Sequence, residues 1–260
     1  MGLKLASISK WRTVLKRAAF TCVLIGGIGP MAHAQSPLSF NLNGFSYQHG
    51  DHYRVVDHEQ DIWTFEHLSL WNWGDMYFFY DDLHQQNLDR HDYYYYYEWS
   101  PRISFGKLTG QPYELGPVRD VLLSSTYERG SDGFNAWLLG FGLDWTVPGL
   151  DFFSTNFYYR DTEGLEGDTW QTTIVWTFPF SIRNLDFVFD GYTDIRGDEG
   201  LAESDLNFNP QLKLDLGKLL GYPQILYGGI EYNHWNNKFG IDGVNERNVS
   251  GLLKLQFSFD

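Results

Sequence analysis

The residue types that carry catalysis or bind metals are sparse in this sequence. His49, His52 and His58 stand three and six residues apart in one polar stretch, where they could coordinate a metal ion, although histidines in polar loops are usually solvated. The chain carries no G-x-S-x-G, H-E-x-x-H or C-x-x-C pattern and no P-loop. These observations favour a protein without catalytic residues, cofactors or bound metals.

Charged residues occur instead within stretches whose side chains alternate in polarity. From Asp205 to Leu216, DLNFNPQLKLDL, apolar residues occupy every second position, and Lys213 and Asp215 lie between them. From Asn135 to Trp145, five large apolar residues alternate with a set that includes Asp144. A side-chain period of two predicts strands with one apolar and one polar face.

Twelve such stretches can be counted between turn signals. They cover residues 39–48, 60–73, 75–82, 93–105, 118–129, 134–146, 152–161, 169–178, 185–195, 205–216, 224–236 and 248–259. Most are longer than the roughly 5–6 residues of soluble strands and match the roughly 9–11 residues that cross an outer membrane. The prediction is an all-β protein, a twelve-stranded antiparallel transmembrane β-barrel of the outer membrane.

The connections between the expected strands alternate in character. Six are hydrophilic, and some concentrate acids, as in DTEGLEGD (Asp161 to Asp168) and RGDEGLAES (Arg196 to Ser204). These acids could hold divalent cations at a lipopolysaccharide surface, but they lack the spacing of a calcium loop. The other connections are mostly short and rich in Gly or Pro, as expected for the periplasmic turns of a barrel.

The stretch HDYYYYYEWSPRIS, His91 to Ser104, contains five consecutive tyrosines. A soluble sheet has little use for large rings on both faces of one strand. In a membrane barrel, the outward rings can join the aromatic girdle at the outer headgroups while the inward rings line the pore mouth. We therefore expect the tyrosine run, which starts at Tyr93, to divide between these two environments.

The first 34 residues differ from the rest of the chain. Five basic residues precede an apolar run from Ala18 to Ile28, and small residues surround Ala34, which is the pattern of a secretory signal peptide. The apolar run is shorter than the roughly 20 residues of a membrane-spanning helix. We expect residues 1–34 to be removed and residues 35–260 to form the barrel. Removal changes the formal charge from −14 to −19, which makes nucleic-acid polymers poor partners.

Three stretches resemble one protein family: FEHLSLWNWGDMYFFYDD (Phe65 to Asp82), YEWSPRISFGKLTG (Tyr97 to Gly110) and YGGIEYNHWNNKFGI (Tyr227 to Ile241). They are similar to the Tsx/OmpK family of Gram-negative outer-membrane proteins, the nucleoside-specific channel-forming porins, and more so to the OmpK branch. The resemblance implies a monomeric twelve-stranded barrel that passes nucleosides and deoxynucleosides and whose outer loops serve as a bacteriophage receptor. One departure is the C-terminus, Phe259-Asp260, because such chains usually end in an aromatic residue that the insertion machinery reads.

Assigning the apolar positions to lipid fixes which residues face the lumen. The candidates for a solute path combine rings for stacking with polar groups for sugar hydroxyls. They are Glu66, Asp75, Tyr77, Phe79, Tyr94, Tyr96, Glu98, Arg102, Asp144, Tyr158, Arg160, Asp190, Tyr192, Lys213, Asp215 and Glu231. An equally simple interpretation is that the charged members form a salt-bridged network that fills a narrow barrel.

The leading hypothesis is passive diffusion of nucleosides or similar small solutes through an outer-membrane channel embedded in lipid and lipopolysaccharide. A general small-solute or cation-preferring porin is the alternative that the acidic charge suggests. An outer-membrane enzyme such as a phospholipase or protease would need an inward or rim Ser/His or Asp/His constellation. Apart from His67 and His234, which lie on expected strands near the aromatic motifs, no histidine is placed for it. A surface structural protein is a further alternative.

Overall fold

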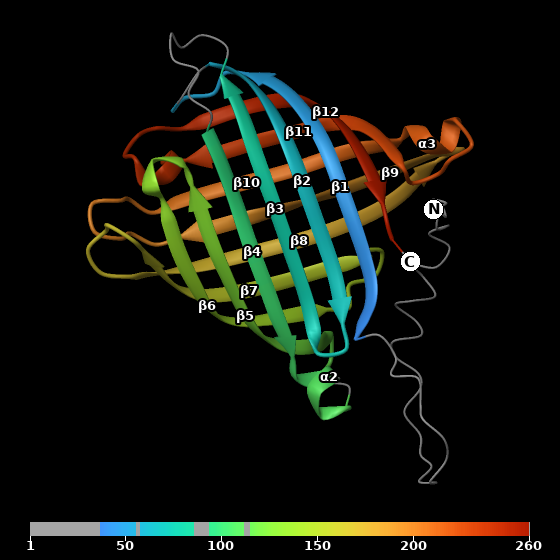
Figure 1. Ribbon diagram of the computed structural model, residues 1–260, viewed down its shortest axis with the longest axis horizontal. Coiled ribbons are helices and arrows are strands. Elements are labelled where there is room, and N and C mark those ends of the chain that lie inside the picture. The colour runs from blue at the N-terminus through green and yellow to red at the C-terminus, as the bar shows by residue number, and fades with distance from the viewer. Residues whose placement is uncertain (1–36, 56–57, 86–93, 112–114, 260) are drawn as a thin grey trace.

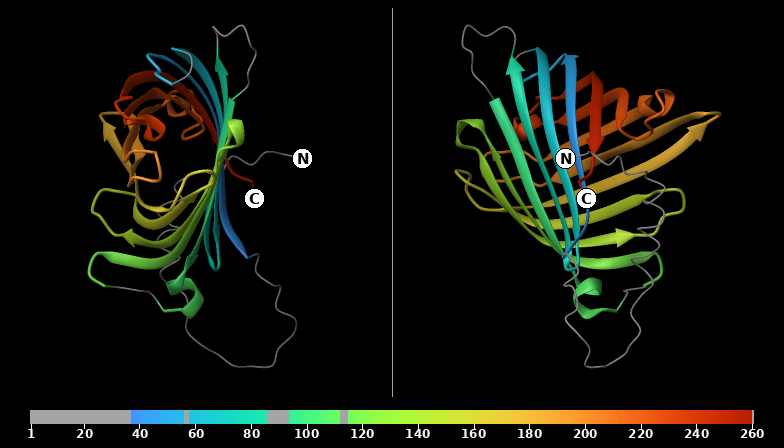
Figure 2. Two further views of the ribbon diagram at one scale, coloured as in Figure 1. Left: turned by 90° about the vertical axis from the view of Figure 1, so that its left-hand side faces the viewer. Right: turned by 45° about the vertical axis from the view of Figure 1, so that its right-hand side comes forward.

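The protein is described by a computed structural model that places residues 37–55, 58–85, 94–111 and 115–259. Twelve antiparallel strands form one closed barrel, in which each strand pairs with its neighbours in the chain and β1 pairs with β12. Figures 1 and 2 show the strands wrapping around a common interior. The predicted all-β, twelve-stranded antiparallel barrel is confirmed. The predicted signal peptide, residues 1–34, lies outside the described residues.

The strand bounds agree with the alternation of side chains. They are β1 Leu38–Asp51, β2 Glu59–Trp71, β3 Gly74–Gln85, β4 Tyr94–Ser104, β5 Val118–Gly130, β6 Asn135–Trp145, β7 Phe152–Thr162, β8 Thr169–Ile182, β9 Leu185–Arg196, β10 Asp205–Asp215, β11 Leu226–Asn236 and β12 Glu246–Phe257. The largest disagreement is at β8, which continues to Ile182 although its end is expected at residue 178. The added residues include Pro179, which pairs with Val188 of β9. The β7–β8 ladder ends at Thr177, so Pro179 has a strand on one side only, where a residue without an N–H is tolerated.

Two helical turns occupy connections that the sequence pattern treats as plain turns. Helix α2 spans Phe105–Thr109 between β4 and β5, and α3 spans Leu216–Leu219 between β10 and β11. Each follows a polar residue at the end of a strand whose side chain caps the first backbone N–H groups: Ser104 accepts from Lys107 N, and Asp215 accepts from Lys218 N. Two short 3₁₀ turns, Ser131–Gly133 and Lys238–Gly240, lie in the connections at the opposite end.

The two faces of the barrel wall have opposite character. On the outward face large apolar side chains are exposed, for example Trp137 at 59 %, with Leu139 and Phe141 beside it along β6. On the interior face polar side chains are buried, for example Lys213 at 3 % exposure. A closed barrel with an apolar outer surface satisfies its backbone internally and belongs in a bilayer. The chain is an outer-membrane β-barrel. Within the described ranges no helix has the length and apolar character to cross a membrane.

The tyrosine run divides between the two faces as expected. Tyr94 and Tyr96 lie on the interior side, where they pair with Leu83 and Asp81 of β3. Tyr95 and Tyr97 lie on the outward side, where their ring centroids are 6.4 Å apart and both stack on Tyr80 at 6.2 and 6.5 Å. These outward rings form part of an aromatic girdle. Tyr93 lies outside the described residues.

The seam that closes the barrel is reinforced by two asparagines on β1. The Asn41 amide donates to the carbonyl of Phe259 at 2.6 Å, and its oxygen accepts from the Phe259 N–H at 3.0 Å. Asn43 Nδ2 donates to the carbonyl of Phe257 at 3.4 Å. These contacts extend the β1–β12 pairing past its last ladder pair, Asn43 with Phe257, and hold the final residues of the chain against the first strand.

Candidate permeation path

All sixteen candidate residues lie on the interior face. The register shows this directly, because one set of partners runs around the wall from Asp75 through Arg102, Ser124 and Gly140 to Tyr158. A side chain directly opposite another on neighbouring strands shares its face. Parity along each strand then places the other members of the set. That a solute contacts these residues remains a prediction.

Arg102 of β4 ties four strands together near the end of the barrel that carries α2. Its guanidinium donates two hydrogen bonds to Asp75, both at 2.8 Å, and one to Asp144 at 3.0 Å. A further bond reaches Ser154 Oγ on β7 at 2.8 Å. The same guanidinium nitrogen also lies 3.4 Å from Asn156 Oδ1. Gly142 leaves space for this network, because an added Cβ there would collide with the Asn156 side chain. Arg102 therefore holds walls that are three strands apart in the barrel order.

Arg160 of β7 forms a second buried centre nearer the outer end. It binds Glu128 of β5 through two hydrogen bonds of 2.7 Å each and donates to Gln171 of β8, also at 2.7 Å. Glu128 was not among the sequence candidates, although it occupies the same parity as Thr126 and Ser124 on its strand. The alternation alone could have found it.

Two lysines form further interior ion pairs, and Arg196 forms another with Asp205 at 2.6 Å. Lys213 Nζ lies 2.7 Å from Asp190 Oδ2, and Lys254 forms an ion pair with Glu66, which also accepts a hydrogen bond from the Tyr77 hydroxyl at 2.7 Å. Asp215 has a different role. Its carboxylate accepts from the backbone N–H groups of Lys218 and Gln224 and so shapes the periplasmic turn that contains α3.

Between the two end turns, four interior carboxylates accept hydrogen bonds from neutral side chains, and the described part of the chain shows no salt bridge to any of these four. They are Asp81, Glu98, Asp194 and Glu231. Glu231, for example, accepts from Gln48 at 2.7 Å and from Gln211 at 2.6 Å. We call these four residues the unpaired carboxylates. Asp81 and Asp194 were missed as site candidates, although parity places both inside.

Interior rings form a continuous row across β3 and β4. Ring centroids are 6.1 Å apart between Tyr77 and Phe79, 5.8 Å between Phe79 and Tyr96, and 6.2 Å between Tyr96 and Phe134. We call these four residues the aromatic row. Tyr77 is 36 % exposed although it faces inward, so its ring is accessible from the lumen. Phe134 was not among the site candidates, although the expected stretch 134–146 includes it and it has the same parity as Ala136 and Leu138.

The other three predicted rings are not members of the aromatic row. Tyr94 lies on the interior face opposite Leu83 of β3. Tyr158 packs with Ala136 and Leu138, with Phe134 beside them. Tyr192 of β9 accepts a hydrogen bond from Asn207 Nδ2 at 3.2 Å. Since β9 is opposite β3 in the closed strand order, Tyr192 faces the row across the lumen.

A buried lysine anchors the first outer connection to the last. Lys238 Nζ lies 2.6 Å from Glu246 and within 5.0 to 5.7 Å of the ring centroids of Trp235, Phe239 and Tyr53. Glu246 also accepts from the backbone N–H of Arg54 at 2.8 Å. Burial lowers the pKa of Lys238, and the charge of Glu246 opposes that shift.

The two histidines that lie on strands near the aromatic motifs do not face the lumen. His67 lies on the outward face and binds Asn43 at 2.9 Å, and His234 lies outward opposite Phe208. In the described part of the chain no three His, Cys, Asp or Glu residues are grouped so as to hold a metal ion.

The apolar outer wall and the polar, ring-lined interior are those of an outer-membrane β-barrel. No model of a known protein family matches the chain. The chain is similar to "Outer membrane protein OmpK" of Vibrio parahaemolyticus, with 29 % identity over 169 residues, which cover 61 % of this chain and 56 % of that protein. The resemblance to OmpK predicted from the sequence motifs is confirmed. The match spans little more than half the length of that relative.

Two solved structures that align with the chain are a porin and an outer membrane protein. The KdgM porin in complex with disordered oligogalacturonate aligns with a TM-score of 0.48 and 11 % identity over 84 % of this chain and 99 % of its own. The outer membrane protein Omp33 of Acinetobacter baumannii aligns with a TM-score of 0.41 and 9 % identity over 86 % of this chain and 100 % of its own.

Proposed function

We propose that this channel passes nucleosides and deoxynucleosides by passive diffusion, without a covalent step. The observation that carries the proposal is the aromatic row on one wall of the lumen. Across the barrel from it, β9 and β10 present Tyr192, Asn209 and Gln211. A nucleoside has a flat base that can stack on rings and a sugar whose hydroxyls need hydrogen-bonding partners, so the two walls suit its two halves.

The magnitudes fit a channel better than a tight receptor. Stacking of one base on an aromatic side chain contributes about 1–3 kcal/mol. Several such contacts in series allow a solute to enter, move along the row and leave, whereas one deep site would trap it. The successive ring spacings of about 6 Å in the aromatic row provide such a series.

The interior charges favour an uncharged solute over a phosphorylated one. The guanidinium and ammonium groups of Arg102, Arg160, Lys213 and Lys254 are already bound to carboxylates. Releasing one for a phosphate would leave a buried carboxylate without its partner, which costs several kcal/mol. The ion pairs therefore act mainly to hold the walls of the lumen, and the solute meets rings, amides and hydroxyls.

A cation-preferring or general small-solute pore is the second candidate. The unpaired carboxylates favour it, because acids without basic partners attract cations and repel anions in a narrow, low-dielectric passage. The two proposals make different demands on the aromatic row. Stacking requires the rings, whereas cation preference requires only the carboxylates.

Solute flux into proteoliposomes tests the leading proposal. We expect adenosine and thymidine to enter faster than sugars of equal size, and the double variant Tyr77→Leu/Phe79→Leu to lose that advantage while sugar flux persists. Tyr80→Leu is the matched control, because its ring belongs to the outward girdle. Equal rates for nucleosides and sugars in the unaltered protein would refute nucleoside selectivity and leave the general pore.

Three further proposals rest on the sequence. We infer that residues 1–34 are a removed signal peptide, which intact mass measurement of the outer-membrane form tests. We infer that the barrel acts as a monomer, which its mass in detergent tests. The resemblance to OmpK supports phage reception by the outer loops, and loop deletions scored by phage adsorption test that role.

A further inference from the structure

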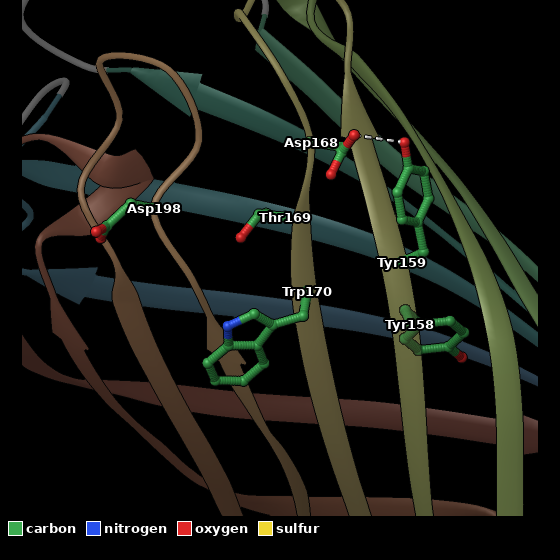
Figure 3. A pocket seen from close by; sticks show the side chains of 6 residues that line it. All are labelled: Tyr158, Tyr159, Asp168, Thr169, Trp170 and Asp198. Carbon is green, nitrogen blue, oxygen red and sulfur yellow. Dashed lines mark hydrogen bonds between the residues drawn. The ribbon is translucent and has the colours of Figure 1, made fainter.

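A pocket opens at the outer rim of the barrel, between the β7–β8 connection (residues 163–168, L4) and the β9–β10 connection (residues 197–204, L5). Its volume is about 550 Å³, and its lining consists of Tyr158, Tyr159, Asp168, Thr169, Trp170 and Asp198. In Figure 3, Thr169 lies between the two aspartates, and Trp170 lies below them. The pocket uses the acidic loops that the channel function leaves unexplained.

Two aromatic side chains form the accessible apolar part of the pocket. Tyr159 of β7 and Trp170 of β8 are directly opposite each other on the outward face, and they are 55 % and 53 % exposed. Gly197 keeps the space beside the indole open, because an added Cβ there would lie 2.7 Å from Trp170 Nε1. The rings are therefore available to a ligand at the level of the outer rim.

The polar groups around these rings are carboxylates and hydroxyls. Asp168 accepts a hydrogen bond from the Tyr159 hydroxyl at 2.7 Å, which leaves its other oxygen for a ligand. Asp198 accepts from the backbone N–H of Ser204 at 2.6 Å. Arginine and lysine do not occur among the lining residues. The pocket is thus suited to donors such as sugar hydroxyls and unsuited to phosphates or uronates.

Contacts within L4 and L5 hold the pocket in shape. Glu199 of L5 is 2 % exposed and accepts from the Thr162 backbone N–H at 2.8 Å and from the Thr162 hydroxyl at 2.7 Å. Gly200 lies against the backbone of Glu166 in L4, so closely that an added Cβ would come within 2.8 Å of its nitrogen. A preformed site binds at a smaller entropic cost than one that must be ordered by its ligand.

We propose that this pocket binds a neutral saccharide. The C–H faces of a pyranose ring would lie against Trp170 and Tyr159, and its hydroxyls would donate to Asp168 and Asp198. Small-molecule sites combine apolar surface with a few oriented polar groups in this way. An aromatic girdle that only contacts lipid headgroups would explain the two rings, but it would not explain the carboxylates of Asp168 and Asp198 beside them. The proposal is independent of nucleoside transport, because Trp170 and Tyr159 lie on the outward face, and the lumen-facing Tyr158 is not among the residues that would bind the sugar.

The same sugar chemistry could come from the core of neighbouring lipopolysaccharide or from a free glycan outside the cell. Titration of the refolded barrel in detergent, followed by saturation-transfer NMR, separates these sources when the probes are a dephosphorylated core oligosaccharide and a maltooligosaccharide. Binding of the first assigns a membrane source, and binding of the second assigns a free glycan. An oligogalacturonate is the acidic control and is expected not to bind.

Variants decide whether a bound sugar occupies this pocket. Asp168→Asn should weaken binding about tenfold, the factor that matches the loss of one charge-assisted hydrogen bond. Trp170→Ala should abolish the saturation transfer, whereas the control Trp137→Ala, which removes an equally exposed indole from β6, should leave it unchanged. The proposal is overturned if neither neutral sugar binds, if the oligogalacturonate binds as well as they do, or if the Trp170 and Trp137 variants behave alike.

Discussion

Replacing Arg102 by glutamine should destabilise the barrel more than the same replacement of any other arginine or lysine on the interior face. The wild-type side chain makes two hydrogen bonds to Asp75, one to Asp144 and one to Ser154, and it is 8 % exposed. Removing one partner of a buried ion pair costs about 3–5 kcal/mol, because the remaining charge is left without compensation. We expect the free energy of unfolding to fall by about that amount.

The structure also predicts which of the two carboxylates is left without a charged partner in Arg102→Gln. Asp144 keeps a second partner, since Arg119 Nη2 lies 3.2 Å from its other oxygen, whereas Asp75 loses both of its bonds to Arg102. Adding Asp75→Asn to Arg102→Gln should therefore restore about 1–3 kcal/mol. Adding Asp144→Asn should restore less. Which of the two double variants regains more free energy of unfolding is a stricter test than the loss of stability in Arg102→Gln alone.

The assay is urea unfolding of the refolded barrel in phospholipid vesicles, followed by tryptophan fluorescence, together with single-channel conductance. Arg119→Gln is the control, because the Arg119 side chain is 40 % exposed, against 9 % for that of Arg102, and an ion pair with an exposed partner contributes about 0–1 kcal/mol. Conductance should rise in Arg102→Gln because its side chain no longer reaches from β4 to β7. If Arg102→Gln and Arg119→Gln cost the same, the bridging role assigned to Arg102 is wrong.

Three other predictions concern the seam, the outer mouth and the lumen. Asn41→Leu removes the two amide hydrogen bonds to the backbone of Phe259, just past the end of β12, and should lower the unfolding midpoint without changing conductance. Urea titration and bilayer recording can check this. Burial lowers the pKa of Lys238, so the unfolded chain holds this proton to higher pH than the folded one. Its contribution to stability should therefore rise with pH between the lowered pKa and the ordinary value near 10.5, and Lys238→Met should flatten that alkaline dependence. Glu98→Gln/Glu231→Gln should reduce the cation-to-anion permeability ratio, measured from reversal potentials in a salt gradient, and an unchanged ratio would exclude these carboxylates from ion selection.

The sequence alone determined the number of strands, their bounds to within a few residues, and the face on which each side chain lies. A period of two is a local property, since every second side chain in a strand points the same way whatever its neighbours are. That is why Lys213 and Asp144 could be placed inside, and why the tyrosine run could be divided between lumen and girdle. The same alternation would have added Glu128 and Asp81 to the candidate set.

Only the tertiary structure decided which interior residues meet. Arg102 and Ser154 are far apart in the chain, and their contact depends on the stagger between strands and on barrel closure. The parity of Asp215 gave no sign that its carboxylate caps a periplasmic turn. The aromatic row includes Phe134, and the outer pocket joins L4 to L5, because closure brings together segments that no local pattern connects. The face on which a side chain lies is set within its own strand. The side chains that it contacts are set by the register of all twelve strands around the barrel.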